Sequence, residues 1–190
     1  SQASSASNSL DLLWDPNTHL WFAADHHNKL PDIWGSMYLV AQNLSSADKR
    51  TAAMEYIFNH SQEVFQYGQA RHLPRNLTWN WCFLGGGQVG SSCPAQGTYQ
   101  NGAYWATPLH YYVAASQNVA ANIPGSQFIV ESVLNNTMDY FRGRNPGGAW
   151  QGTCECVNPA INYHGVDAYV ASATNVLQAL SLWLDTEDRG

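Results

Sequence analysis

The sequence predicts an all-α fold in which helical hairpins form an inner and an outer layer. Three observations support this prediction. Apolar residues recur at helical spacing in five long segments. No segment alternates between apolar and polar residues over a convincing length, which argues against a β-rich fold. The connections between the segments are alternately short and long, and the simplest geometry for that order is a series of helical hairpins.

Each of the five segments has the apolar pattern of a helix that packs against a core. The predicted helices, in chain order, span residues 33–44, about 47–65, about 102–117, 125–141 and about 166–184. Ser46 belongs to a strongly preferred N-cap type and is expected to begin the second helix. The fifth segment is the most apolar of the five.

Two connections are long, residues 67–101 before the third helix and residues 142–165 before the fifth. Long loops without secondary structure in a compact domain usually have a function. In a series of hairpins, the first, third and fifth helices begin at the same end. We therefore expect the polar and aromatic residues that open these three helices to meet there and line a pocket.

The composition fits one domain with a substantial core. Of 190 residues, 45% are apolar and only 12% are charged. Residues 1–9 form a small polar run, so we expect a flexible lead-in and then a single domain over residues 10–190. The net charge is −6 and the eight basic residues are scattered, which argues against nucleic acid as a partner. No apolar run approaches the roughly 20 residues of a membrane span.

Four Asn-x-Ser/Thr sequons predict N-glycosylation, and their acceptor residues are Asn43, Asn59, Asn76 and Asn135. Together with an even number of cysteines, they indicate a eukaryotic glycoprotein of the secretory pathway. The expected location is therefore outside the cell.

The four cysteines, Cys82, Cys93, Cys154 and Cys156, are expected to form two disulfides. A bridge between Cys154 and Cys156 would close a very small and strained ring. Cys82 can pair with Cys93, or these two can pair crosswise with the other two, and the sequence does not choose. The chain has neither a Cys-x-x-Cys pair nor histidines at zinc-finger spacing, so no metal site and no cofactor are expected.

The segment GTYQNGAYW, residues 97–105, combines aromatic and amide side chains before a predicted helix. Aromatic rings stack on the apolar faces of sugars, and amides both donate to and accept from hydroxyl groups. The segment is therefore typical of a pocket for a neutral, polyhydroxylated ligand. The alternative is that Tyr104 and Trp105 belong to the core while Gln100 and Asn101 cap the helix.

The chain resembles the C-terminal half of the six-hairpin, (α/α)6-barrel glycosidases, and most of all the branch of inverting glycoside hydrolases related to α-L-rhamnosidases. The segments that carry the resemblance are PDIWGSMYLV (residues 31–40), GTYQNGAYWATPLHYYVA (97–114), NP…NY (158–163) and YVASATNVLQAL (169–180). It covers residues 14–184 approximately. It implies about half of an (α/α)6 barrel, hydrolysis of an oligosaccharide or glycan, and a partner polypeptide that supplies the other half. That half can be the other piece of a cleaved precursor, a separate subunit or a further part of the same protein.

Inverting hydrolysis needs two carboxyl groups roughly 6.5–9.5 Å apart, one as acid and one as base. By its position in a Trp-containing loop before the last inner helix, Glu155 is similar to the general base of these families. Asp32 precedes the first helix, where we expect an N-cap that also contacts a sugar hydroxyl or serves as the acid. The resemblance implies that the acid lies in the missing N-terminal half. The expected substrate-binding residues are Trp34, Tyr99, Gln100, Asn101, Trp105 and His164.

Two other functions fit the same sequence. The chain can be a catalytically silent subunit that binds carbohydrate, or has a structural role, in an extracellular glycoprotein assembly. A lyase or epimerase on the same scaffold would use Tyr99 or His164 as a base, beside Arg71 or Arg75 as the group that binds a uronate.

Overall fold

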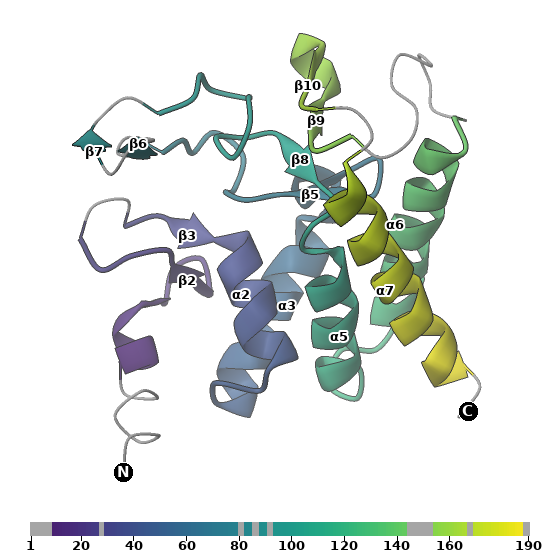
Figure 1. Cartoon of the computed structure of the whole chain (residues 1–190). Helices are drawn as coiled ribbons and strands as arrows, with labels where there is room; N and C mark the ends of the chain where they lie inside the picture. Colours follow the sequence, from purple (N-terminus) through teal and green to yellow (C-terminus); the bar gives the residue numbers. More distant parts are fainter. Residues whose placement is uncertain are drawn as a thin grey trace.

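The computed structural model describes residues 9–26, 29–79, 82–84, 88–90, 93–143, 154–166 and 169–187. In this part of the chain, helices pack side by side and short antiparallel strands gather near one end of the helices (Figure 1). None of the helices formed by these residues is long and apolar enough to cross a membrane.

The helices account for most of the regular structure. They are α2 (Ile33–Ala41), α3 (Ala47–Asn59), α4 (Ser61–Val64), α5 (Leu109–Val119), α6 (Ser126–Phe141) and α7 (Val170–Glu187). Ser46 caps α3 as predicted, because its side chain accepts a hydrogen bond from the Lys49 backbone N–H at 3.4 Å.

The strands are two or three residues long and form three antiparallel sheets. The first sheet contains β1 (Trp14–Asp15), β2 (Leu20–Phe22) and β3 (Pro31–Asp32), in that order. The second has the order β10-β9-β8-β5-β4, with β4 (Phe65–Gln66), β5 (Gln69–Arg71), β8 (Tyr104–Trp105), β9 (Val157–Asn158) and β10 (Tyr163–His164). The third pairs β6 (Cys82–Leu84) with β7 (Gln88–Gly90).

The prediction of an all-α fold, and with it about half of an (α/α)6 barrel, is wrong. The chain has a mixed architecture, in which a five-stranded sheet joins segments from three distant parts of the sequence. Strands this short show no apolar alternation over a measurable length, so the pattern that reveals longer strands is missing here. Their pairing depends on how the loops meet in space.

The helix boundaries also differ from the prediction, and two of the differences have a clear local cause. The third helix begins at Leu109 instead of residue 102, because residues 104–105 pair with β5 and Pro108 occupies the N-cap. The first helix ends at Ala41 instead of residue 44. Asn43 has φ 55°, and the Leu44 N–H donates to the Leu39 carbonyl at 3.0 Å, which is the geometry of a Schellman motif.

The core lies between the helices. α5 packs against both α2 and α7, and all three begin at the end where the five-stranded sheet lies (Figure 1). Met37 on α2 and Leu109 and Tyr112 on α5 are completely buried. Burial of a side chain such as Met37 or Leu109 contributes roughly 1.5–3 kcal/mol to stability. The predicted common end of these three helices is therefore confirmed, and the strands around it form the walls of the sites described below.

Candidate functional site

The Asp32 side chain caps the start of α2 and also contacts His72. Its Oδ1 accepts a hydrogen bond from the Gly35 backbone N–H at 3.0 Å, which confirms the predicted N-cap of α2. The same oxygen lies 3.2 Å from Nε2 of His72, and both side chains are largely buried. A methyl group on Gly35 would come within 2.7 Å of the other carboxylate oxygen. The carboxylate is therefore fixed in place from two sides.

Four further aromatic side chains pack around His72 and one another, and we call Trp34, His72, Trp79, Tyr99 and Trp105 the aromatic cluster. The ring centroid of His72 lies 4.5 Å from that of Trp34 and 5.1 Å from that of Trp79. Trp105 packs edge to face against Trp34 at 5.8 Å and against Tyr99 at 5.0 Å. Residues from the start of α2, the segment after β5 and the 97–105 segment thus meet in one cluster.

The members of the aromatic cluster differ in exposure. Trp105 is only 4% exposed, so it supports the cluster from the core, whereas Tyr99 is 39% exposed. Trp34 Nε1 and His72 Nδ1 are buried and have no hydrogen-bond partner among the described residues. Buried polar atoms normally find a partner, so two orphaned atoms in one cluster require an explanation.

Glu155 lies on the Tyr99 side of the aromatic cluster. Burial raises the pKa of the Tyr99 hydroxyl, and the negative charge of Glu155 raises it further. The Glu155 backbone is held by a hydrogen bond from its N–H to the Val166 carbonyl at 2.8 Å. A methyl group on Gly165 would come within 2.9 Å of Glu155 Oε2, so the carboxylate lies close against this segment.

The cysteines beside Glu155 are not bridged. Cys154 and Cys156 are buried thiols, so the expectation of two disulfides involving all four cysteines is wrong. Burial and the neighbouring Glu155 raise the pKa of the Cys156 thiol to about 12, which keeps it protonated at neutral pH. Cys93 is disulfide-bonded. The side chain of Cys82 lies outside the described residues.

Asn101 shapes the loop and has little capacity left for a ligand. It is 3% exposed, and its Oδ1 accepts from the Trp79 backbone N–H at 2.7 Å. Its Nδ2 donates to the Pro94 carbonyl at 2.7 Å. These bonds favour a structural role for Asn101, and its predicted sugar contact stays a prediction. The alternative of a helix cap is wrong, because α5 begins at Leu109 with Pro108 as its N-cap.

The other predicted contacts, Gln100 and His164, are exposed. Gln100 is tied to the aromatic cluster through its carbonyl, which accepts a hydrogen bond from Trp79 Nε1 at 3.1 Å. The Nδ1 atom of His164 lies 2.9 Å from the carbonyl oxygen of Gly165. His72 and Trp79 were not predicted. The available signal was the presence of aromatic residues in the long 67–101 connection.

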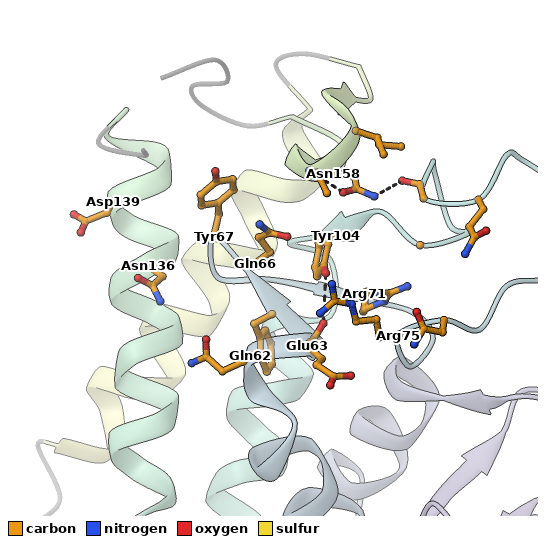
Figure 2. Close-up of a pocket in the computed structure, with 17 residues that line it drawn as sticks. Gln62, Glu63, Gln66, Tyr67, Arg71, Arg75, Tyr104, Asn136, Asp139 and Asn158 are labelled. Atoms are coloured by element: carbon orange, nitrogen blue, oxygen red, sulfur yellow. Dashed lines mark hydrogen bonds between the residues drawn. The ribbon is translucent and has the colours of Figure 1, made fainter. Parts of the chain in front are cut away.

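A polar pocket of about 850 Å³ lies on the other face of the five-stranded sheet (Figure 2). Neighbouring residues of a strand point to opposite faces, so Tyr104 lines this pocket while Trp105 enters the aromatic cluster. Arg71, the last residue of β5, also lines the pocket, whereas the next residue, His72, pairs with Asp32. None of the residues predicted for the glycoside hydrolase is among the described residues that line it, whereas Arg71 and Arg75, named for a lyase or epimerase, both line it.

No known protein family, curated protein or solved structure matches this chain. The function must therefore be inferred from the geometry of the two sites and the residues that form them.

Proposed function

We propose that the aromatic cluster, together with Asp32 and Glu155, binds carbohydrate and that the chain is part of a secreted, inverting glycoside hydrolase. One observation supports this most strongly. Three separate segments, the start of α2 and two loops, bring Trp34, Tyr99 and a carboxylate together at one end of the helices. Aromatic rings and carboxylates are the groups that bind a sugar ring and activate water at its anomeric carbon.

The proposed roles follow from the partners of each group. Glu155 acts as the general base, because its carboxylate is half-buried beside the exposed ring of Tyr99. Asp32 is engaged by the start of α2 and by His72, so we assign it to orienting His72 and contacting the sugar rather than to proton donation. The unpartnered Trp34 Nε1 can only donate and His72 Nδ1 can donate or accept; because both atoms are buried, they reach a sugar hydroxyl only if the aromatic cluster opens.

The general acid is then expected on a partner polypeptide. Three exposed apolar residues, Val170, Leu177 and Leu184, recur every seven residues along α7 and so share one helix face. An apolar helix face open to solvent is typical of a surface that another polypeptide covers. This observation supports a partner, and the activity assay must use the complete assembly.

Replacing Glu155 with Gln tests the proposed base. The side-chain shape is retained but the base is lost, so the rate of glycoside hydrolysis by the complete assembly should fall by about 10²–10⁴-fold. Glu131→Gln is the matched control, because Glu131 is exposed on α6. Steady-state rates on a panel of aryl glycosides measure the fall in hydrolysis rate. NMR of the first-formed product shows the anomeric configuration of the released sugar.

Two results would contradict the proposed reaction. Unchanged turnover in Glu155→Gln would assign the base elsewhere, and retention of configuration would exclude the inverting mechanism. Circular dichroism and a thermal melt of each variant show whether the fold is intact. Wild-type protein that binds oligosaccharide without cleaving any glycoside would favour the second candidate, a silent carbohydrate-binding subunit. The engagement of Asp32 by a helix cap and a histidine is the observation that favours that candidate.

A further inference from the structure

Arg71 is a buried cation, and no carboxylate of the described residues forms an ion pair with it. It is 9% exposed, and its Nε is completely buried with no hydrogen-bond partner among the described residues. No carboxylate in the described part of the chain lies within 4.0 Å of its nitrogens. A buried charge is costly unless another group compensates it, so this arrangement favours an anion beside Arg71.

The side chain of Arg71 is held in a fixed position at the wall of the polar pocket. The guanidinium carbon lies 5.6 Å from the ring centroid of Tyr104, in a cation–π contact. The Tyr104 hydroxyl donates to the Glu63 carbonyl at 3.5 Å, which anchors the ring. Gly102 approaches the guanidinium so closely that a Cβ there would lie 3.3 Å from Arg71 Nη2. The guanidinium is therefore positioned before any ligand arrives.

A second arginine lines the same pocket. Arg75 is exposed and lies in the segment that follows β5, whose last residue is Arg71 (Figure 2). The acidic residue across the pocket, Asp139, extends from α6 away from the arginines in Figure 2. Glu63 also lines the pocket but makes no ion pair with either arginine. This end of the pocket is accordingly suited to negative charge.

The rest of the lining consists largely of uncharged polar side chains. Gln62, Gln66, Gln96 and Asn136 contribute amide groups, which can both donate to and accept from hydroxyls. Asn158 fixes another wall, because its Nδ2 donates to the Gly97 carbonyl at 2.8 Å. The volume of about 850 Å³ is that of a site for a small organic ligand and far exceeds what a single inorganic anion fills.

We propose that this pocket binds an acidic saccharide, with Arg71 and Arg75 on its carboxylate, sulfate or phosphate group and the amides on its hydroxyls. Two parallel N–H···O bonds from a guanidinium match the geometry of such an oxyanion. The pocket shares no side chain with the aromatic cluster and lies on the opposite face of β8. It is therefore a second site, and it also separates Arg71 from Tyr99, which disfavours the predicted pairing of these residues in a lyase or epimerase.

Isothermal titration with small ligands tests the site directly. Glucuronate, glucose 6-sulfate and glucose 6-phosphate should each bind at least about tenfold more tightly than glucose, and more tightly than inorganic sulfate. The Arg71→Gln and Arg75→Gln variants should each bind glucuronate with an affinity lower by on the order of 10- to 100-fold, the loss expected when a charge-assisted hydrogen bond is removed. Raising the salt concentration should weaken the binding of the acidic sugars and leave the affinity for glucose unchanged.

The controls separate a lost ligand contact from a damaged fold. Arg142→Gln removes an exposed arginine outside the pocket and should bind glucuronate like the wild type. Arg71→Lys keeps the charge but not the paired donors, so it should bind with intermediate affinity. Arg75 is exposed, so its replacement tests the site even if Arg71→Gln fails to fold.

Three outcomes would overturn the proposal. They are equal binding of glucose and glucuronate, binding that survives replacement of both arginines, and inorganic sulfate binding as tightly as the acidic sugars. Hydrolysis at the aromatic cluster is measured separately, with Glu155→Gln. Failure of the proposed hydrolase therefore leaves the result for this pocket unaffected, and the reverse is also true.

Discussion

At the scale of single residues, Asp32 shows how one carboxylate can serve both stability and a binding site. Replacing it with Ala removes the bond to the Gly35 N–H and should lower the free energy of unfolding by about 1–2 kcal/mol. Asn is an equally good N-cap residue, so Asp32→Asn should recover most of this loss while removing the charge beside His72. Urea denaturation of the three proteins measures the difference. If Asn is as destabilising as Ala, the contact with His72 outweighs the cap.

The same scale shows why only part of the candidate site could be predicted. Asp32 was identifiable as a cap because capping depends on its immediate neighbours in the sequence. Asn101 was not identifiable as a loop anchor, because its partners Trp79 and Pro94 are 22 and seven residues away. His72 joins the site only through the fold. Residue type indicates what a side chain can bind, whereas its actual partner depends on tertiary contacts.

At the scale of elements, we expect the stability of the fold to depend on pH through His110, in the first turn of α5. Burial lowers the pKa of His110 from its ordinary value of 6.5, and a backbone contact with Thr107 opposes this only in part. Below pH 6.5 the unfolded chain therefore binds a proton that the folded chain does not, so the free energy of unfolding falls as the pH decreases. Relative to a His110→Gln variant, the wild type should lose stability between pH 7.5 and about pH 5. A constant difference between the two denaturation curves would show that His110 titrates normally.

Helices and strands differ in how well the sequence predicts them, for a physical reason. The fourth predicted helix, 125–141, agrees with α6 (Ser126–Phe141) because its apolar residues recur over four turns. The second, 47–65, is interrupted at His60, where α3 ends and α4 begins. β8 consists of Tyr104 and Trp105 alone, and two residues cannot display a period. Its pairing with β5 and β9 comes from segments more than 30 and 50 residues away, which no local pattern records.

At the scale of the whole molecule, the four sequons predict where glycans would lie relative to the two sites. All four acceptor asparagines are exposed: Asn43, Asn59, Asn76 and Asn135. Asn43 follows α2, Asn59 is the last residue of α3 and Asn135 lies on α6, whereas Asn76 lines the polar pocket. A glycan at Asn76 would therefore compete with a saccharide ligand for the mouth of that pocket.

Protein secreted from a eukaryotic host should carry glycans on at least two of the four asparagines, as glycopeptide mass spectrometry would show. Four unmodified asparagines would remove the argument for secretion. If Asn76 is modified, the Asn76→Gln variant should bind glucuronate more tightly than the wild type, because the bulky glycan beside Arg71 and Arg75 is gone. Asn59→Gln is the control, since Asn59 does not line the pocket and its glycan should leave binding unchanged. Equal effects of the two replacements would mean that the glycans act on the whole molecule, and the location of Asn76 would then have no special consequence for the site.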